Sequence, residues 1–148
     1  MENFASLLTG TVGDYKPVPA APALAYPVVI TSYEYGKSRG NQTPYVRLIC
    51  SVTDWPEDFD DEDVKSRVNI VGRKLHVDFW LTDKAIPQLL KLALNCGVSK
   101  STPAKLIPDE LIGKSGIMIT KHRMSRPRHE LDEPEAILEG DKLIGIPA

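Results

Sequence analysis

The sequence has few of the features that mark an enzyme or a metal site. It contains two cysteines among 148 residues, and it has no HxxxH, CxxC, GxGxxG or GxxxxGK[ST] motif. Zinc sites and phosphate-binding loops are recognised by such spacings. We therefore predict no catalytic residues, no metal site and no cofactor.

Long apolar stretches are also lacking. No apolar run approaches the roughly 20 residues that a membrane span needs. Residues 1–17, MENFASLLTGTVGDYKP, lack the basic start and apolar centre of a secretory signal. We expect a cytoplasmic protein that does not bind membranes. In that compartment Cys50 and Cys96 are expected to be reduced, buried thiols rather than a disulfide.

The net charge of −2 does not indicate a general DNA-coating protein, which is usually basic. The charge is segregated, however. Residues 54–63 hold seven carboxylates and no base, and residues 114–129 hold five Lys or Arg and no acid. Residues 130–141 are acidic again. Exposed charges are screened beyond roughly 8–10 Å. The sign of each local run therefore matters more for the binding of a charged partner than the net charge of the chain does.

A chain of this length is expected to form one domain. Residues 1–25 end in proline and alanine without periodicity and are predicted to be an extended arm, so residues 26–148 form the domain. Alternation of apolar residues predicts strands, and a stripe at i, i+3, i+4 and i+7 predicts one amphipathic helix. The strands are expected at 26–35, 43–54, 72–82, 113–124 and 135–146, and a further helical turn within 102–113. The helical stripe comprises Ile86, Leu89, Leu90, Ala93 and Leu94, with Thr82 or Asp83 as the cap at its start and Gly97 just past its end.

Three strands, a helix and two strands predict a mainly β fold. Strands joined by tight turns are antiparallel, and a small antiparallel sheet is stabilised by closing on itself. We predict a five-stranded OB-like barrel with the amphipathic helix between strands 3 and 4.

Aromatic and basic residues alternate with the apolar stripes of the first three strands. Proteins that bind single-stranded nucleic acid stack bases on rings and neutralise phosphates with Lys or Arg. The pattern therefore predicts a non-catalytic single-stranded DNA-binding surface. Its candidate residues on the strands are Tyr33, Tyr35, Tyr45, Arg47, Lys74, His76 and Trp80.

The basic segment after the fourth strand offers a second contact. Lys121, Arg123, Arg126 and Arg128 run from a strand into a loop that could grip a phosphate backbone. The alternative is a solvated loop whose bases pair with the acidic stretch that follows.

Three stretches, VVITSYEYGKSRGNQTPYVRLICSV, GRKLHVDFWLTDKAIPQLLKLALNCGV and LIGKSGIMITKH, together resemble a family of phage and prophage single-stranded DNA-binding proteins. The resemblance covers about residues 26–122. It implies an OB-like fold and a role in phage DNA replication or recombination, in the host cytoplasm. By position it adds Lys37, Arg39, Asn41, Arg73 and Lys114 to the candidate residues, with Lys74 again among those matched.

Partners beyond DNA are also expected. The acidic segments could recruit replication or recombination proteins, and the sheet edges and the arm favour a homo-oligomer. Two other functions remain open. In the first, exposed Tyr and Trp anchor protein partners in a phage assembly or counter-defence module. In the second, Asp78 and a carboxylate of residues 54–63 hold Mg²⁺ in a nuclease.

Overall fold

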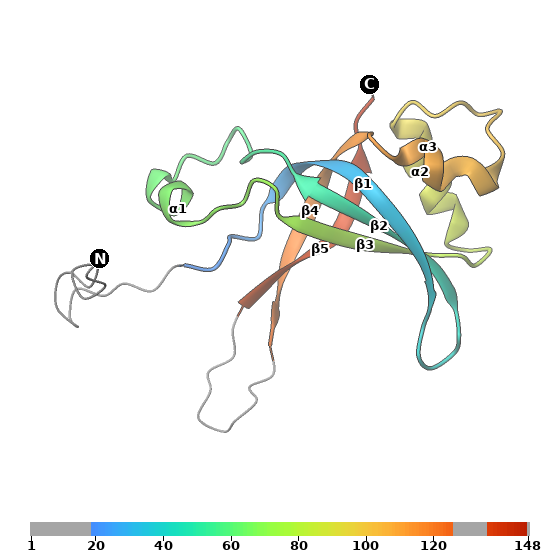
Figure 1. Cartoon of the computed structure of the whole chain (residues 1–148), viewed down its shortest axis with the longest axis horizontal. Helices are drawn as coiled ribbons and strands as arrows, with labels where there is room; N and C mark the ends of the chain where they lie inside the picture. The colour runs from blue at the N-terminus through green and yellow to red at the C-terminus, as the bar shows by residue number, and fades with distance from the viewer. Residues whose placement is uncertain (1–18, 126–135, 148) are drawn as a thin grey trace, which may run out of the picture.

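The structure, a computed structural model, describes residues 19–125 and 136–147 (Figure 1). Its strands match the predicted ones, and its helices lie in the two connections that flank β3. The elements are β1 (Ala25–Lys37), β2 (Pro44–Val52), α1 (Glu62–Arg67), β3 (Lys74–Trp80), α2 (Ile86–Asn95), the 3-10 turn η3 (Ala104–Leu106), α3 (Ile107–Leu111), β4 (Ser115–Met124) and β5 (Ala136–Gly145).

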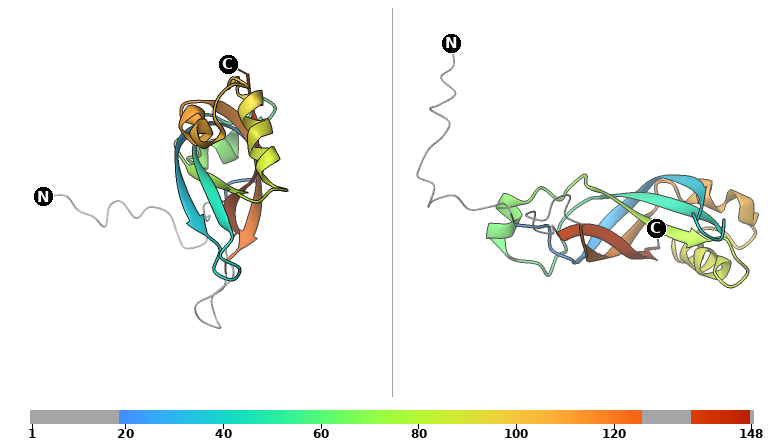
Figure 2. Two further views of the ribbon diagram at one scale, coloured as in Figure 1. Left: turned by 90° about the vertical axis from the view of Figure 1, so that its right-hand side faces the viewer. Right: turned by 90° about the horizontal axis from the view of Figure 1, so that it is seen from below.

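The strands form one antiparallel sheet in the order β3-β2-β1-β4-β5. The predicted mainly β class and the helix between β3 and β4 are confirmed. The sheet curls so that β1 and β2 face β4 and β5, with α2 and α3 at one end (Figure 2). Its edge strands β3 and β5 approach each other without forming a ladder, so the barrel is open along this seam.

The two edge strands approach each other closely at Gly140. A Cβ built on Gly140 of β5 would lie 2.4 Å from the backbone oxygen of His76 in β3. Any side chain at position 140 would therefore push the strands apart. Five residues later, a Cβ built on Gly145 would lie 2.6 Å from the Cys96 Sγ. The residues after α2 thus close one end of the seam.

The core lies between the inner face of the sheet and α2. Leu75 and Val77 of β3 point inward, as their alternation predicted. Helix α2 buries Leu89 and Ala93 of the predicted stripe and also Leu92, which lies outside it, whereas Leu94 of the stripe is 47% exposed. Pro87 lies in the first turn, where its missing N–H costs no helical hydrogen bond.

The acidic segment is only partly the loop that its composition predicts. Asp61 accepts a hydrogen bond from the Val64 backbone and caps α1, which carries acids in its first turn and bases in its last. Ahead of the helix, Trp55 stacks on Phe59 with a centroid distance of 5.1 Å and an interplanar angle of 22°. Trp55 also packs against the core, with its ring centroid 5.9 Å from that of the buried Tyr26, and this contact holds the segment against the domain.

The described end of the predicted arm, residues 19–24, has no regular secondary structure but contacts the sheet. Ala21 is buried, and the Leu24 carbonyl accepts hydrogen bonds from the backbone and hydroxyl of Thr120 in β4. Cys50 and Cys96 are buried free thiols, as predicted. No helix in the described ranges is long and apolar enough to cross a membrane.

Candidate nucleic-acid interface

A β-bulge decides which aromatic residues of β1 share a face with those of β2. The pairing of β1 with β2 shifts by one residue between Ile30 and Ser32. A one-residue shift moves every later side chain to the opposite face of the strand. Tyr33 and Tyr35 therefore pair with Leu48 and Val46 on the inner face.

The outer face of β2 and β3 carries a row of three contacting side chains. Tyr45 and Trp80 are paired across the strands, and their rings meet edge to face with centroids 5.6 Å apart. On the other side, the Arg47 guanidinium carbon lies 5.3 Å from the centroid of the Tyr45 ring. Trp80 is 42% exposed. We call Tyr45 and Trp80 the aromatic platform.

Gly36 of β1 makes room for this platform. A Cβ at Gly36 would lie 2.4 Å from the Tyr45 hydroxyl and 2.5 Å from its Cζ. The hydroxyl end of the Tyr45 ring thus lies against the Gly36 backbone, and the ring is held between β1 and Trp80. A ring held in this way keeps little rotational freedom to lose when a base stacks on it.

Arg47 faces outward as predicted, but its charge is already compensated. Its Nε donates to Asp78 at 2.7 Å and its second guanidinium nitrogen donates to the same carboxylate at 3.2 Å. Glu34 lies 3.6 Å away on the neighbouring strand. The bond to Asp78 raises the pKa of Arg47 above its usual range. Arg47 therefore braces the sheet face and does not offer a free cation to a phosphate.

Unpaired cations lie instead at the tip of the β1–β2 hairpin, which projects from the body of the domain (Figure 1). Lys37, Arg39 and Asn41 are exposed there. Within residues 19–125 and 136–147, neither Lys37 nor Arg39 takes part in an ion pair. The turn is held by the Ser38 hydroxyl, which accepts from the Thr43 backbone at 3.0 Å.

Two further predicted residues share the platform face. Lys74 and His76 are exposed on β3, opposite Ser51 and Ile49. Arg73 lies just ahead of β3. Burial raises the pKa of Tyr26 to about 12, and the nearby charge of Arg73 partly opposes this rise. Lys114 precedes β4 near Cys96. Lys74 and His76 therefore share the outer face of β3 with Trp80, six and four residues before it, whereas Arg73 and Lys114 lie just ahead of their strands.

Tyr33 and Tyr35 do not join the platform. Their rings contact each other edge to face at 5.6 Å, and the Tyr33 hydroxyl donates to Asp109 of α3 at 2.7 Å. That hydrogen bond raises the pKa of Tyr33. Of the four predicted aromatic residues, Tyr45 and Trp80 therefore share the outer face, and Tyr33 and Tyr35 lie on the other face because of the bulge in β1.

The described bases of the basic segment pair with carboxylates of the acidic stretch that follows it in the sequence. Lys121 lies 3.4 Å from Asp141 and 3.8 Å from Glu139, and Arg123 lies 3.0 Å from Glu139. These are pairs across β4 and β5, so the carboxylates of β5 offset both bases. Arg126 and Arg128 lie outside the described residues.

Sequence reasoning missed Glu34 and Gly36 as parts of this face. Glu34 reaches Arg47 because of the bulge, which has no clear sequence signal. Gly36 did have one, because a glycine inside a strand pattern often marks a close approach of other groups to the backbone. The described residues contain no group of three His, Cys, Asp or Glu placed to hold a metal ion.

Comparison with protein-family models finds no family that matches this chain, and comparison with curated proteins finds no significant match. The resemblance to phage single-stranded DNA-binding proteins therefore stays a prediction.

Proposed function

We propose that this protein binds single-stranded DNA without catalysing a reaction. The observation that carries the proposal is the contact between Tyr45 and Trp80 on the exposed outer face of β2 and β3. In OB-type barrels, the face of strands 2 and 3 and the adjoining loops bind oligonucleotides. Two bases would stack on these rings while the strand backbone passes the hairpin tip.

Electrostatics gives the hairpin a separate role. Lys37 and Arg39 are exposed bases of the hairpin that joins β1 to β2 beside Tyr45, and neither is offset by a described carboxylate. They would neutralise phosphates, whereas the rings would hold bases. Binding would then depend on salt, but with a modest slope set by few phosphate contacts.

The sequence resemblance supports the biological setting of the proposal. On that resemblance we propose a role in phage DNA replication or recombination, in the cytoplasm of the host and as a homo-oligomer. The acidic segments would recruit the accompanying proteins.

One observation favours a second candidate, a protein-interaction module. Carboxylates compensate the charges of Arg47, Lys121 and Arg123, which lowers the free positive charge of the sheet. Tyr, Trp and Arg are also the residues that dominate protein interfaces. On this reading the same platform would anchor a protein partner.

Fluorescence anisotropy with a labelled oligothymidylate distinguishes single-stranded DNA binding from the protein-interaction module. Micromolar or tighter binding that weakens as salt is raised, with much poorer binding to duplex DNA, supports the first function. No binding to the single strand at micromolar protein would contradict it. Equal binding to duplex would contradict base stacking as the mode of recognition.

A further inference from the structure

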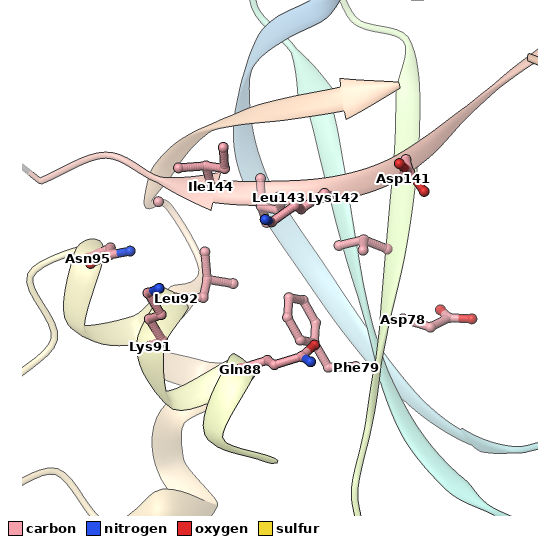
Figure 3. Close-up of a pocket in the computed structure, with 12 residues that line it drawn as sticks. Asp78, Phe79, Gln88, Lys91, Leu92, Asn95, Asp141, Lys142, Leu143 and Ile144 are labelled. Atoms are coloured by element: carbon pink, nitrogen blue, oxygen red, sulfur yellow. The ribbon is translucent and has the colours of Figure 1, made fainter. Parts of the chain in front are cut away.

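The open seam of the barrel contains a groove of about 640 Å³ between β3, β5 and α2 (Figure 3). Its volume falls in the range typical of ligand sites. The groove lies on the far edge of β3 from β2, and it takes no part in the function proposed above. Its lining residues on α2 are Gln88, Lys91, Leu92 and Asn95, and those on the strands are Val77, Asp78, Phe79 and residues 141–145.

Main-chain groups of β3 face this groove without a strand partner. Leu81 donates to the Pro44 carbonyl and Val52 donates to the Arg73 carbonyl. In an antiparallel ladder such bonded pairs alternate, so residues 75, 77 and 79 bond to β2. The N–H and C=O groups of Asp78 and Trp80 then point away from β2, toward the seam.

The same reasoning applies to β5 on the opposite wall. Ile146 donates to the Ser115 carbonyl, so Ile144 and Lys142 form the bonded pairs with β4. The main chain of Leu143 and Gly145 is directed toward the seam. Two unpaired strand edges therefore border one groove, an arrangement that invites an added strand.

The side chains around the groove indicate which residues an added strand would need. Its floor is apolar, with Leu92 and Leu143 buried and Phe79 half-buried. Lys91 and Lys142 are exposed and have no ion-pair partner among the described residues, whereas Asp78 and Asp141 are paired with Arg47 and Lys121. The uncompensated charge at the groove is positive.

We propose that this groove binds an extended acidic peptide of a partner protein by strand addition. The peptide backbone would pair with the edge of β3 or β5. Alternate apolar side chains would contact Leu92, Leu143 and Phe79, and the acidic side chains between them would meet Lys91 and Lys142. The bound segment is short, since Gly140 and the end of α2 close the seam on either side.

A peptide fits this groove better than a nucleic acid does. The exposed rings suited to bases, Tyr45 and Trp80, lie on the outer face and not in the groove. The ring in the groove, Phe79, packs against the core. Unpaired backbone groups along a strand edge are matched by another peptide backbone.

The test uses the whole chain and a labelled, capped peptide of about nine residues that alternates glutamate with valine. We expect saturable binding, and we expect Lys91→Glu with Lys142→Glu to weaken it about tenfold or more. Lys84→Glu with Lys105→Glu is the matched control, because both lysines are exposed and neither lines the groove. The control pair should leave the affinity within about twofold.

A second measurement keeps strand addition separate from a loose contact with lysines. Backbone N-methylation at alternate peptide positions removes the donors that strand pairing needs, so it should abolish binding. Hydrogen exchange should show new protection at the amides of Asp78, Trp80 or Leu143. Equal binding of the methylated peptide, or protection elsewhere, would overturn the proposal. So would protection of these amides by oligothymidylate with no binding of the peptide.

Oligonucleotide binding is measured on the same variants. Loss of peptide binding in Lys91→Glu with Lys142→Glu, with unchanged DNA binding, shows that the groove acts independently of the platform. The groove proposal and the DNA proposal can therefore fail separately.

Discussion

Arg47 and Asp78 form a bidentate ion pair across β2 and β3, with nitrogen–oxygen distances of 2.7 and 3.2 Å. Both side chains are partly buried on the face that carries the aromatic platform. The pair holds Arg47 beside Tyr45 and removes its charge from the exposed surface. The behaviour of the platform toward DNA depends on this arrangement.

Asp78→Asn should free the Arg47 charge. We expect tighter binding to oligothymidylate at low salt, by about two- to tenfold, and a salt slope that steepens by up to about 0.7. Anisotropy titrations at several salt concentrations measure both. Asp83→Asn removes an equal charge outside the platform and should change neither. An unchanged slope in Asp78→Asn would mean that Arg47 makes no phosphate contact even when released.

Trp80→Ala should weaken single-strand binding by about 5- to 150-fold, the effect of losing one stacked base. The side chain is exposed, so the midpoint of thermal unfolding should change little. Tyr35→Ala is the control, because Tyr35 is exposed to a similar or greater extent but lies on the other face of the sheet. Similar losses in both variants would contradict the platform.

Gly36→Ala should act on DNA binding through Tyr45. The added methyl would collide with the Tyr45 ring, whose far end can swing away without disturbing the backbone. We expect affinity to fall as it does in Tyr45→Ala. In the Tyr45→Ala background, Gly36→Ala should then have no further effect, which a double-mutant cycle by anisotropy checks. Additive losses would show that Gly36 acts in another way.

Gly140→Ala should destabilise the fold by about 1–3 kcal/mol, the usual result of forcing atoms into a filled space. The methyl would meet the His76 carbonyl, which belongs to a strand and cannot move cheaply. Gly40→Ala is the matched control, since no atom lies within 4 Å of a Cβ there. Urea unfolding compares the two. Equal stability would show that β3 and β5 do not touch at this point.

Stability should fall in mildly alkaline solution because of Cys50. Burial raises the pKa of this thiol to about 12 in the folded protein, whereas an unfolded cysteine titrates near pH 8.5. The contribution is complete below about pH 8.5 and is lost as the pH rises toward 12, by up to about 1.4 kcal/mol per pH unit. Cys50→Ala should flatten this slope in urea unfolding from about pH 8.5 to 10.5. An unchanged slope would contradict it.

The sequence by itself determined the five strands, helix α2 and the direction of most strand side chains, but not helix α1. Alternation placed Leu75, Val77 and Trp80 on the correct faces of β3, and the helical stripe located α2. These predictions hold because strand and helix periods are local properties of the backbone. The hairpin between β1 and β2 was readable for the same reason.

Only the tertiary structure decided which of these residues share a surface. A bulge after Ile30 turns Tyr33 and Tyr35 away from the platform and brings Glu34 to Arg47. Cross-strand carboxylates compensate the charges of Lys121 and Arg123, whereas Lys37 and Arg39 have no ion-pair partner among the residues that the structure describes. The groove arises because β3 and β5, far apart in the sequence, come together without pairing. Such relations depend on register and on long-range contacts, which no local pattern encodes.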